Sequence, residues 1–147
     1  MIKICEIALT EDRVQQLIAL SHMWVDENIS NGMVTNSRED IKEPIFAALE
    51  GEKIVGYAFG HAYVKEKKTD SVPVGSRCFD VDELYVLPAY RSQGIGGRLF
   101  QAVEAYAKTQ GDFLTLATST KDYKRVLHFY AEQNGMDFHD AYLTKKL

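Results

Sequence analysis

The chain has 147 residues, 46% of them hydrophobic, which is enough to bury one proper hydrophobic core. Its formal net charge of −4 argues against the broad basic face by which many proteins bind nucleic acid. No stretch approaches the ~20 consecutive apolar residues that cross a bilayer. Acidic residues interrupt the apolar ones near the N-terminus, unlike in a signal peptide, and two cysteines are too few for a disulfide framework. We therefore expect a single cytoplasmic domain over residues 1–147, with no nucleic-acid and no membrane partner.

The first half of the chain predicts a strand, two helices and a hairpin. Residues 2–8 alternate loosely between apolar and polar, as a strand does. Thr10 is a suitable N-cap for a helix that ends near residues 31–32, and Ser37 followed by Asp40 indicates a short second helix before Pro44. Residues 45–64 are rich in apolar and β-branched residues around a polar turn, which predicts a hairpin. A connection without periodicity then follows.

The stretch that follows predicts a strand, a glycine loop and a helix in succession. The strand contains apolar β-formers and should stop at Leu87, because Pro88 cannot donate to a sheet ladder. Glycines follow at positions 94, 96 and 97, and apolar residues then recur at helical spacing as far as Tyr106. We expect this helix to end at about Gln110, before Gly111.

A loop of this kind is suited to binding an anion. The first N–H groups of a helix have no intrahelical partner, and the helix dipole is positive there. Glycines let a phosphate approach the backbone closely, and Arg91 and Arg98 add positive charge on either side. A dinucleotide fingerprint would need glycine where Leu99 stands, and the Gly-Lys-Ser/Thr ending of a P-loop is absent. The loop therefore fits a diphosphate without matching either of those motifs.

Three further elements complete the prediction. Residues 113–118 alternate enough to form a strand, and residues 123–134 carry an apolar stripe at helical spacing before Gly135. Residues 137–145, with Phe138, Tyr142 and Leu143, predict a last strand.

Two short motifs resemble those of one enzyme family. Arg91-Ser92-Gln93-Gly94-Ile95-Gly96, between a strand and a helix, resembles the acetyl-CoA motif Q/R-x-x-G-x-G/A of the GNAT superfamily of N-acetyltransferases. Residues 128–136 resemble the family's second element, F-Y-x-x-x-G-F, in the expected place. The resemblance covers the chain from its first strand to its end and implies an α/β (α+β) fold. It would be one GNAT-like domain with a mixed, mostly antiparallel sheet flanked by helices, in the order βααββ-βα-βα-β, with the closing pair of strands shortened to one.

The resemblance implies acetyl-CoA as co-substrate and assigns residues to it. Tyr130 matches the tyrosine that protonates the departing thiolate in many members. Tyr123 stands where many members have an asparagine near the cofactor, which puts that contact in doubt. We expect no metal, because the four histidines show no metal-ligand spacing. The expected cofactor-binding residues are Leu84, Tyr85, Val86, Arg91, Ser92, Gln93, Gly94, Ile95, Gly96, Gly97 and Arg98.

The proton chemistry of such a reaction requires a base. An alkyl ammonium with a pKa of about 10 must lose a proton before it can attack a thioester. Carboxylates on the strand before Pro88 are the candidates, and Asp82, nine residues before Arg91, matches a proposed base of polyamine acetyltransferases. We rank Asp82 ahead of Glu83 and Asp80. In a regular strand Asp80 and Asp82 share one face and Glu83 points to the other, although a β-bulge would change this.

The acceptor amine is expected to be small and cationic and to attack acetyl-CoA directly in a ternary complex. The resemblance places the acceptor near the first helix, which carries Trp24, Asp26 and Glu27, and Asp80 adds negative charge from the strand before Pro88. These four are the expected acceptor-binding residues, and the acidic ones among them favour a cation. A protein N-terminus or lysine is an alternative acceptor. A non-catalytic acyl-CoA-binding or regulatory module is an alternative function, which Tyr130 disfavours and Tyr123 slightly favours. The oligomeric state is open, with a homodimer as one expectation.

Overall fold

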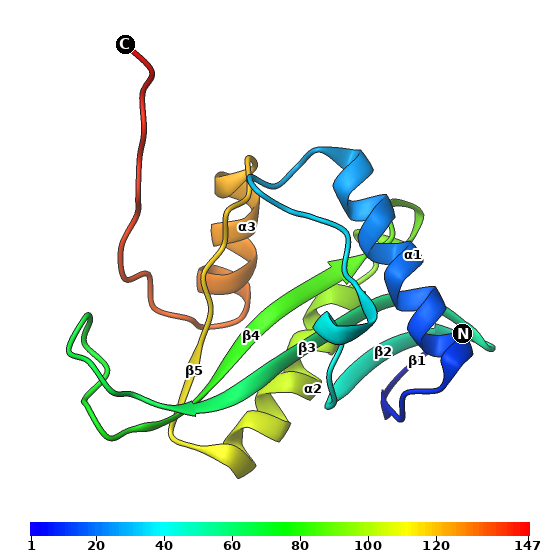
Figure 1. Ribbon diagram of the computed structural model, residues 1–147, viewed down its shortest axis with the longest axis horizontal. Helices are drawn as coiled ribbons and strands as arrows, with labels where there is room; N and C mark the ends of the chain where they lie inside the picture. The colour runs from blue at the N-terminus through cyan, green and yellow to red at the C-terminus, as the bar shows by residue number, and fades with distance from the viewer.

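Five strands form one sheet in the spatial order β1-β2-β3-β4-β5 in the computed structural model, which describes residues 1–147 (Figure 1). The first four strands pair antiparallel, and β5 runs parallel to β4. This arrangement confirms the mixed, mostly antiparallel sheet. The strands are β1 (Ile2–Ile7), β2 (Ile45–Glu50), β3 (Lys53–Val64), β4 (Arg77–Val86) and β5 (Phe113–Thr115).

Helices cover both faces of this sheet. Helix α1 crosses one face and α2 lies on the other (Figure 1). Trp24 of α1 stacks on Tyr85 of β4, whereas Tyr106 of α2 packs against Phe79 of the same strand. None of the helices is long and apolar enough to cross a membrane. The helices are α1 (Glu11–Glu27), α2 (Ile95–Gln110) and α3 (Tyr123–Leu127), which continues as π-helix over His128–Gln133, with 3-10 turns at Arg38–Asp40 and Pro88–Tyr90.

The hydrophobic core lies on both sides of the central strands. On the α1 side, Leu17 packs into the cluster that contains Tyr57 of β3, and both side chains are fully buried. On the α2 side, Leu99 and Val103 are also fully buried, as their helical spacing predicted. Cys78 is buried in β4 and forms no disulfide. The core therefore fixes β3 and β4, the strands that carry the candidate site, from both faces.

A β-bulge in β4 changes which way its carboxylates point. Two consecutive β3 residues pair with Glu83 and Val81, so Asp82 is the extra residue without a partner. The alternation of a regular strand, which would separate Glu83 from Asp80, therefore does not apply, and the β-bulge that we allowed for is present. An extra residue reverses the alternation of side chains along the strand, and Glu83 and Asp80 come to share the face on which α1 lies.

Four predicted elements differ in extent from the structure. Helix α1 ends at Glu27 rather than near residues 31–32, because Asn28 adopts a left-handed conformation. Strand β5 ends at Thr115 rather than at residue 118, because its pairing with β4 stops there.

The expected helix before Pro44 is only the 3-10 turn Arg38–Asp40, although its capping box is present, because the chain turns inward at Ile41, which is buried. The predicted strand over residues 137–145 is not formed. A strand needs a neighbouring strand to satisfy its backbone groups, and this segment hydrogen-bonds to no other strand.

Candidate active site

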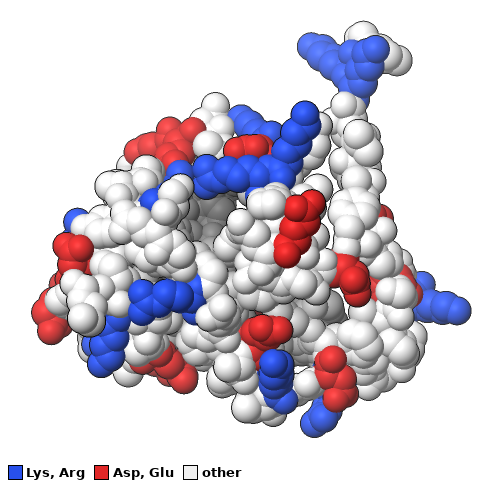
Figure 2. All heavy atoms as spheres, turned by 180° about the vertical axis from the view of Figure 1, so that it is seen from behind, with Lys and Arg blue, Asp and Glu red and all other residues white.

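A cleft of about 950 Å³ opens where β4 and β5 separate. The two strands pair only where Cys78–Asp80 faces Phe113–Thr115, and beyond the bulge they diverge. On this side of β4 the backbone groups from Glu83 to Tyr85 have no ladder partner, so they are free to bind a ligand. The face shown in Figure 2 is hollowed near its centre, with Lys and Arg side chains along the upper rim of the hollow. Five segments line the cleft together with Trp24 of α1: the second half of β4, the loop before α2 with the start of that helix, residues 29–33, residues 116–120 and the end of α3 with its π-helix.

The loop before α2 forms a cradle of backbone N–H groups at one end of the cleft. Ser92 and Gly94 both have positive φ, 59° and 77°, and Gly94 caps α2 without a side-chain hydrogen bond. Alternation of such left-handed residues turns successive N–H groups toward one point and makes an anion-binding concavity. A Cβ at Gly97 would meet no atom within 4 Å, so this side of the cradle is open. The arrangement suits a diphosphate.

Arg91 lines the cleft but is held by the protein. Its two terminal nitrogens donate to the Glu27 carboxylate, each at 2.7 Å, and its Nε donates to the carbonyl of Val86 at 2.8 Å. The guanidinium also lies over the ring of Tyr85. Partial burial raises the pKa of Glu27, but the hydrogen bonds from Arg91 and Tyr85 outweigh it, and the net pKa is lowered. This ion pair joins α1 to the loop and leaves Arg91 few donors for a ligand.

The other expected cofactor residues divide into two groups. Gln93 and Arg98 do not line the cleft: Gln93 donates to the carbonyl of Ala89, and Arg98 donates to the carbonyl of Ile2 in β1. The structure brings the remaining ones together around the cleft, namely Leu84, Tyr85, Val86, Ser92, Gly94, Ile95, Gly96 and Gly97.

Tyr130 enters the cleft from the π-helical turn. Its ring packs against Phe129, with ring centroids 4.9 Å apart, and against Phe100 of α2 at 5.9 Å. The hydroxyl has no hydrogen-bond partner in the protein, and burial raises the pKa of Tyr130 to about 12. The phenol is therefore protonated at neutral pH and free to donate a hydrogen bond into the cleft. Tyr123 is 59% exposed and does not line the cleft.

Glu83 is fixed in the cleft by two donors. Its Oε2 accepts hydrogen bonds from the Tyr57 hydroxyl at 2.7 Å and from the Asn36 amide at 2.8 Å. Burial raises the pKa of Glu83, the two hydrogen bonds oppose that rise, and the negative charge of Asp82 adds to it. Asn36 is itself anchored, because its backbone N–H donates to Ser21, a fully buried residue of α1. Glu83 is therefore a rigid carboxylate with raised basicity.

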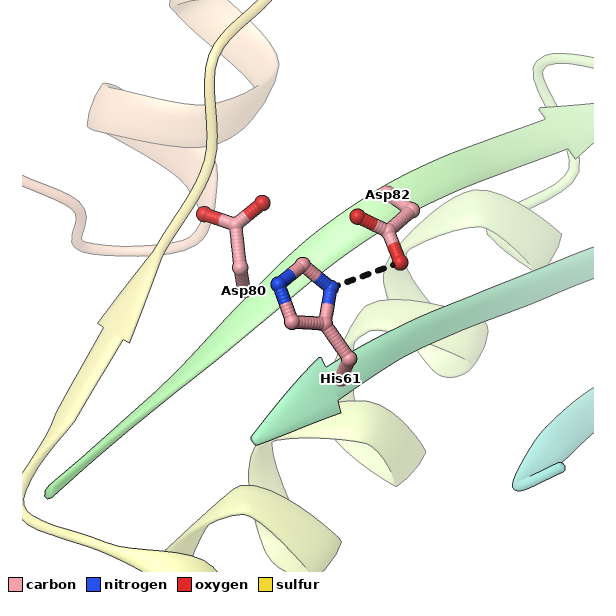
Figure 3. A group of neighbouring side chains, drawn as sticks. All are labelled: His61, Asp80 and Asp82. Carbon is pink, nitrogen blue, oxygen red and sulfur yellow. Dashed lines mark hydrogen bonds and ion pairs between the residues drawn. The ribbon is translucent and has the colours of Figure 1, made fainter. Parts of the chain in front are cut away.

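The other two carboxylates of β4 lie beside His61 of β3 (Figure 3). Asp82 lines the cleft and contacts His61, with Oδ2 2.9 Å from Nδ1. Asp80 does not line the cleft and accepts a hydrogen bond from Thr115 of β5 at 2.6 Å. One donor atom from each of the three side chains lies within 4.8 Å of the others, a group that the spacing of the histidines cannot reveal because it forms across two strands. Nothing else in the structure points to a bound ion there, and we assign no metal to it.

The α1 side of the cleft carries Trp24. Its ring stacks on Tyr85, with centroids 5.1 Å apart, and its Nε1 donates to the Ser30 hydroxyl. The other acceptor candidates on α1 do not line the cleft: Asp26 faces solvent beside His22, and Glu27 holds Arg91. The structure thus brings Trp24 together with Glu83 and Asp82, and leaves Asp26, Glu27 and Asp80 outside.

Several residues of the site were not predicted from the sequence. Asn36 and Tyr57, which orient Glu83 from behind the cleft wall, lie 47 and 26 residues from it along the chain, so no local pattern could have found them. Residues 29–33 and 116–120 also line the cleft and lie side by side, joined by a bridge between Ser30 and Thr120. Arg125 of α3 also lines the cleft and has no ion-pair partner. One signal could have pointed to Arg125. A cation on the exposed side of a short helix is not a core residue, so it is a candidate for binding a phosphate.

Comparisons with known proteins agree with this architecture. An aminoglycoside acetyltransferase, meta-AAC0020, from an uncultured soil metagenomic sample is 18% identical over 99% of this chain and 96% of its own, with a TM-score of 0.70. An acetyltransferase of Trypanosoma brucei is 17% identical over 100% of both chains, with a TM-score of 0.69. The aminoglycoside N-acetyltransferase AAC(6')-Iy, solved with CoA, is 15% identical over 99% of this chain and 98% of its own, with a TM-score of 0.68.

At these identities the likeness shows the fold, and the sequence itself shows the family. A comparison with curated proteins found no match. The model of the Acetyltransferase (GNAT) family, by contrast, matches residues 8–136, which is most of the chain. The chain therefore belongs to the GNAT family of acetyltransferases.

Proposed function

We propose that this protein transfers the acetyl group of acetyl-CoA to a primary amine of a small cationic molecule, by direct attack in a ternary complex. One observation carries the proposal. A single cleft joins an anion cradle at the start of α2 to a free phenol, Tyr130, and to two carboxylates, Glu83 and Asp82, that have no Lys or Arg partner. Thioester aminolysis needs these groups: a seat for the diphosphate, a donor for the thiolate and an acceptor for the ammonium proton.

Acetyl-CoA is held by backbone groups more than by side chains in this proposal. The diphosphate lies on the N–H groups of Gly94, Ile95 and Gly96, where the dipole of α2 is positive. The amide-bearing pantetheine arm follows the unpaired backbone edge of β4 beyond Glu83, as an added strand would. The fold's likeness to AAC(6')-Iy, a protein solved with CoA, supports this assignment.

The ammonium proton goes to Glu83. An alkyl ammonium has a pKa of about 10, so an acceptor of ordinary carboxylate basicity faces a steep uphill transfer. Burial raises the pKa of Glu83, and two hydrogen bonds hold its carboxylate in place with the second oxygen unengaged. On geometry we therefore place Glu83 ahead of Asp82, which the sequence had ranked first. Asp82, exposed at the bulge, binds the ammonium as counter-charge.

Tyr130 assists the departing thiolate. A phenol with a pKa of about 12 transfers its proton to a thiolate of pKa ~8.5 only with a cost of roughly 5 kcal/mol. Its first contribution is therefore a hydrogen bond to the sulfur as negative charge develops, and full transfer follows when the nitrogen loses its second proton after attack. Across the step the N–C bond forms and the C–S bond breaks. The proton that Glu83 takes from the ammonium passes to solvent, and the second proton, lost by the nitrogen after attack, balances the proton gained by the thiolate.

The proposed acceptor class rests on the negative charge of the cleft and on the proteins of similar structure. Glu83 and Asp82 present negative charge beside Trp24, which suits a cation. Two proteins of similar structure are aminoglycoside acetyltransferases, and aminoglycosides are polycationic amines, so we extend that class to this protein as a proposal.

The test is release of free CoA thiol from acetyl-CoA with a panel of polyamines, aminoglycosides, amino-acid derivatives and peptides. Acceptor-dependent release that is strongest with small cationic amines supports the proposal. Tight binding of acetyl-CoA with no acceptor-dependent release would show a non-catalytic acyl-CoA-binding module instead. A preference for peptide N-termini or lysine peptides would move the substrate class to proteins.

A further inference from the structure

Tyr130 lies in a turn that is wound as π-helix. Helix α3 is α-helical only as far as Leu127, and His128–Gln133 continue as π-helix. A π turn contains one residue more than an α turn, so the side chains within it leave the helix in different directions. Such turns are rare and are frequently found at functional sites. The winding of this segment therefore decides where the Tyr130 phenol points.

Two hydrogen bonds close the π-helical turn. The side-chain amide of Asn134 donates to the carbonyl of Phe129 at 2.8 Å, and this bond is partly buried. The backbone N–H of Met136 donates to the carbonyl of Tyr130 at 3.0 Å. Gly135 lies between the two donors with a φ of 71°, a left-handed conformation that lets Met136 fold back onto the turn. The carbonyls of Phe129 and Tyr130 are thus each bound by a residue just beyond the turn.

Packing against α2 does not by itself fix the direction of the phenol. The rings of Phe129 and Tyr130 both pack against Phe100, with ring centroids 6.4 Å and 5.9 Å from it. The hydrophobic attraction between such groups is non-directional, and no hydrogen bond from the protein holds the Tyr130 hydroxyl. The geometry of the turn is therefore what places the phenol in the cleft.

We propose that Asn134 is a positioning residue for Tyr130: its side-chain amide holds the π-helical turn in the winding that aims the phenol at the reacting sulfur. The inference rests on the proposed function, in which Tyr130 donates to the departing thiolate. Asn134 also lines the cleft, but its amide is engaged by the Phe129 carbonyl, so it acts through the turn. Without this bond the turn can rewind as α-helix, which moves the phenol. A misplacement of about 1 Å can cost ~100-fold in rate.

A double-mutant cycle with Tyr130→Phe tests the proposal. Asn134→Leu keeps the size of the side chain and removes the donor, as does Asn134→Asp when it is ionised. Each should lower kcat for thiol release about tenfold or more, while the acetyl-CoA dissociation constant stays within about threefold of the wild type. In the Tyr130→Phe background each should lower kcat by less than about twofold further, because the hydroxyl that Asn134 positions is already absent. Gln110→Leu is the control and should leave kcat unchanged, since it removes an amide donor at the other end of α2, away from the cleft.

Two results would overturn the inference and leave the proposed function standing. One is a kcat of Asn134→Leu equal to that of the wild type, beside a slow Tyr130→Phe. The other is a pair of losses that multiply in the double variant, which would show that Asn134 acts by a route other than the phenol. A wild type that releases no thiol with any acceptor, or a fast Tyr130→Phe, would instead contradict the proposed function.

The crystal structure of Asn134→Leu tests the positioning without any turnover. We expect residues 128–133 to be wound as α-helix in the variant, with the Tyr130 ring displaced from Phe100. A variant that keeps the π-helix and this ring contact overturns the inference, whatever its activity. Thermal unfolding of the variant establishes that it is folded before either comparison is made.

Discussion

Tyr130→Phe separates a chemical role from a structural one. The substitution removes only the hydroxyl and keeps the ring contacts with Phe129 and Phe100. Because the hydroxyl makes no hydrogen bond within the protein, its loss leaves no protein group unsatisfied. We expect the free energy of unfolding to change by no more than ~0.5 kcal/mol.

Turnover is expected to fall far more. Removing one well-placed donor to developing charge typically costs about 10² to 10³ in kcat, or ~2.7–4 kcal/mol of transition-state stabilisation. Because the donor acts on charge that exists only in the transition state, the dissociation constant of acetyl-CoA should stay within about threefold of the wild type. A loss of roughly 3 kcal/mol of transition-state stabilisation, with almost no change in the free energy of unfolding, would distinguish hydrogen-bond donation to the thiolate from a packing role of Tyr130.

The assay is thiol release under saturating acetyl-CoA with the best acceptor, beside calorimetric binding of acetyl-CoA and thermal unfolding. Phe129→Leu is the matched control, since it alters a neighbouring ring without touching the phenol. Near-full turnover of Tyr130→Phe would refute the reasoning and leave the thiolate to depart unassisted. Because burial raises the pKa of Tyr130 to about 12, any fall in activity at mildly alkaline pH belongs to another group.

Three further substitutions probe the site. Glu83→Gln should lower turnover about 10² to 10⁴-fold. Because burial raises the pKa of Glu83, the wild-type protein loses stability as pH rises through that pKa. The variant cannot ionise there, so it should unfold at an equal or higher temperature than the wild type at pH 7. Gly97→Ala should raise the acetyl-CoA dissociation constant tenfold or more, ~1.4 kcal/mol, yet stabilise α2, because its methyl group meets open space in the cradle; unchanged affinity would place the diphosphate elsewhere. Arg91→Ala should lower the free energy of unfolding in urea by about 2–4 kcal/mol, because Glu27 is left partly buried without its partner, and a variant as stable as the wild type would show that this ion pair is dispensable.

Elements that depend on neighbouring residues could be predicted from the sequence. The backbone N–H of Arg13 donates to the Thr10 hydroxyl, as an N-cap requires, and α2 ends at Gln110. The strand that stops before Pro88, the glycine loop and the helix were all predicted in order. The reason is that capping, helical spacing and the loss of a donor at proline act within one or two turns of the chain.

Contacts between distant segments were decided only by the tertiary structure. The bulge at Asp82 sets the direction of three carboxylates, and it is a property of how β4 pairs with β3. Arg91, which the motif suggested for phosphate, is held by Glu27, 64 residues away.

Even a correctly predicted residue can have a reason that is tertiary. Gly111 ends α2 as expected, but its φ of −175° is open to any residue, and a Cβ there would lie 2.3 Å from the Arg77 carbonyl. The predicted strand at residues 137–145 lacks a partner in the single chain. The local sequence pattern indicates which secondary structure a segment can form. Strand register and the pairing of side chains between segments depend on the packing of the whole chain, so only the tertiary structure determines them.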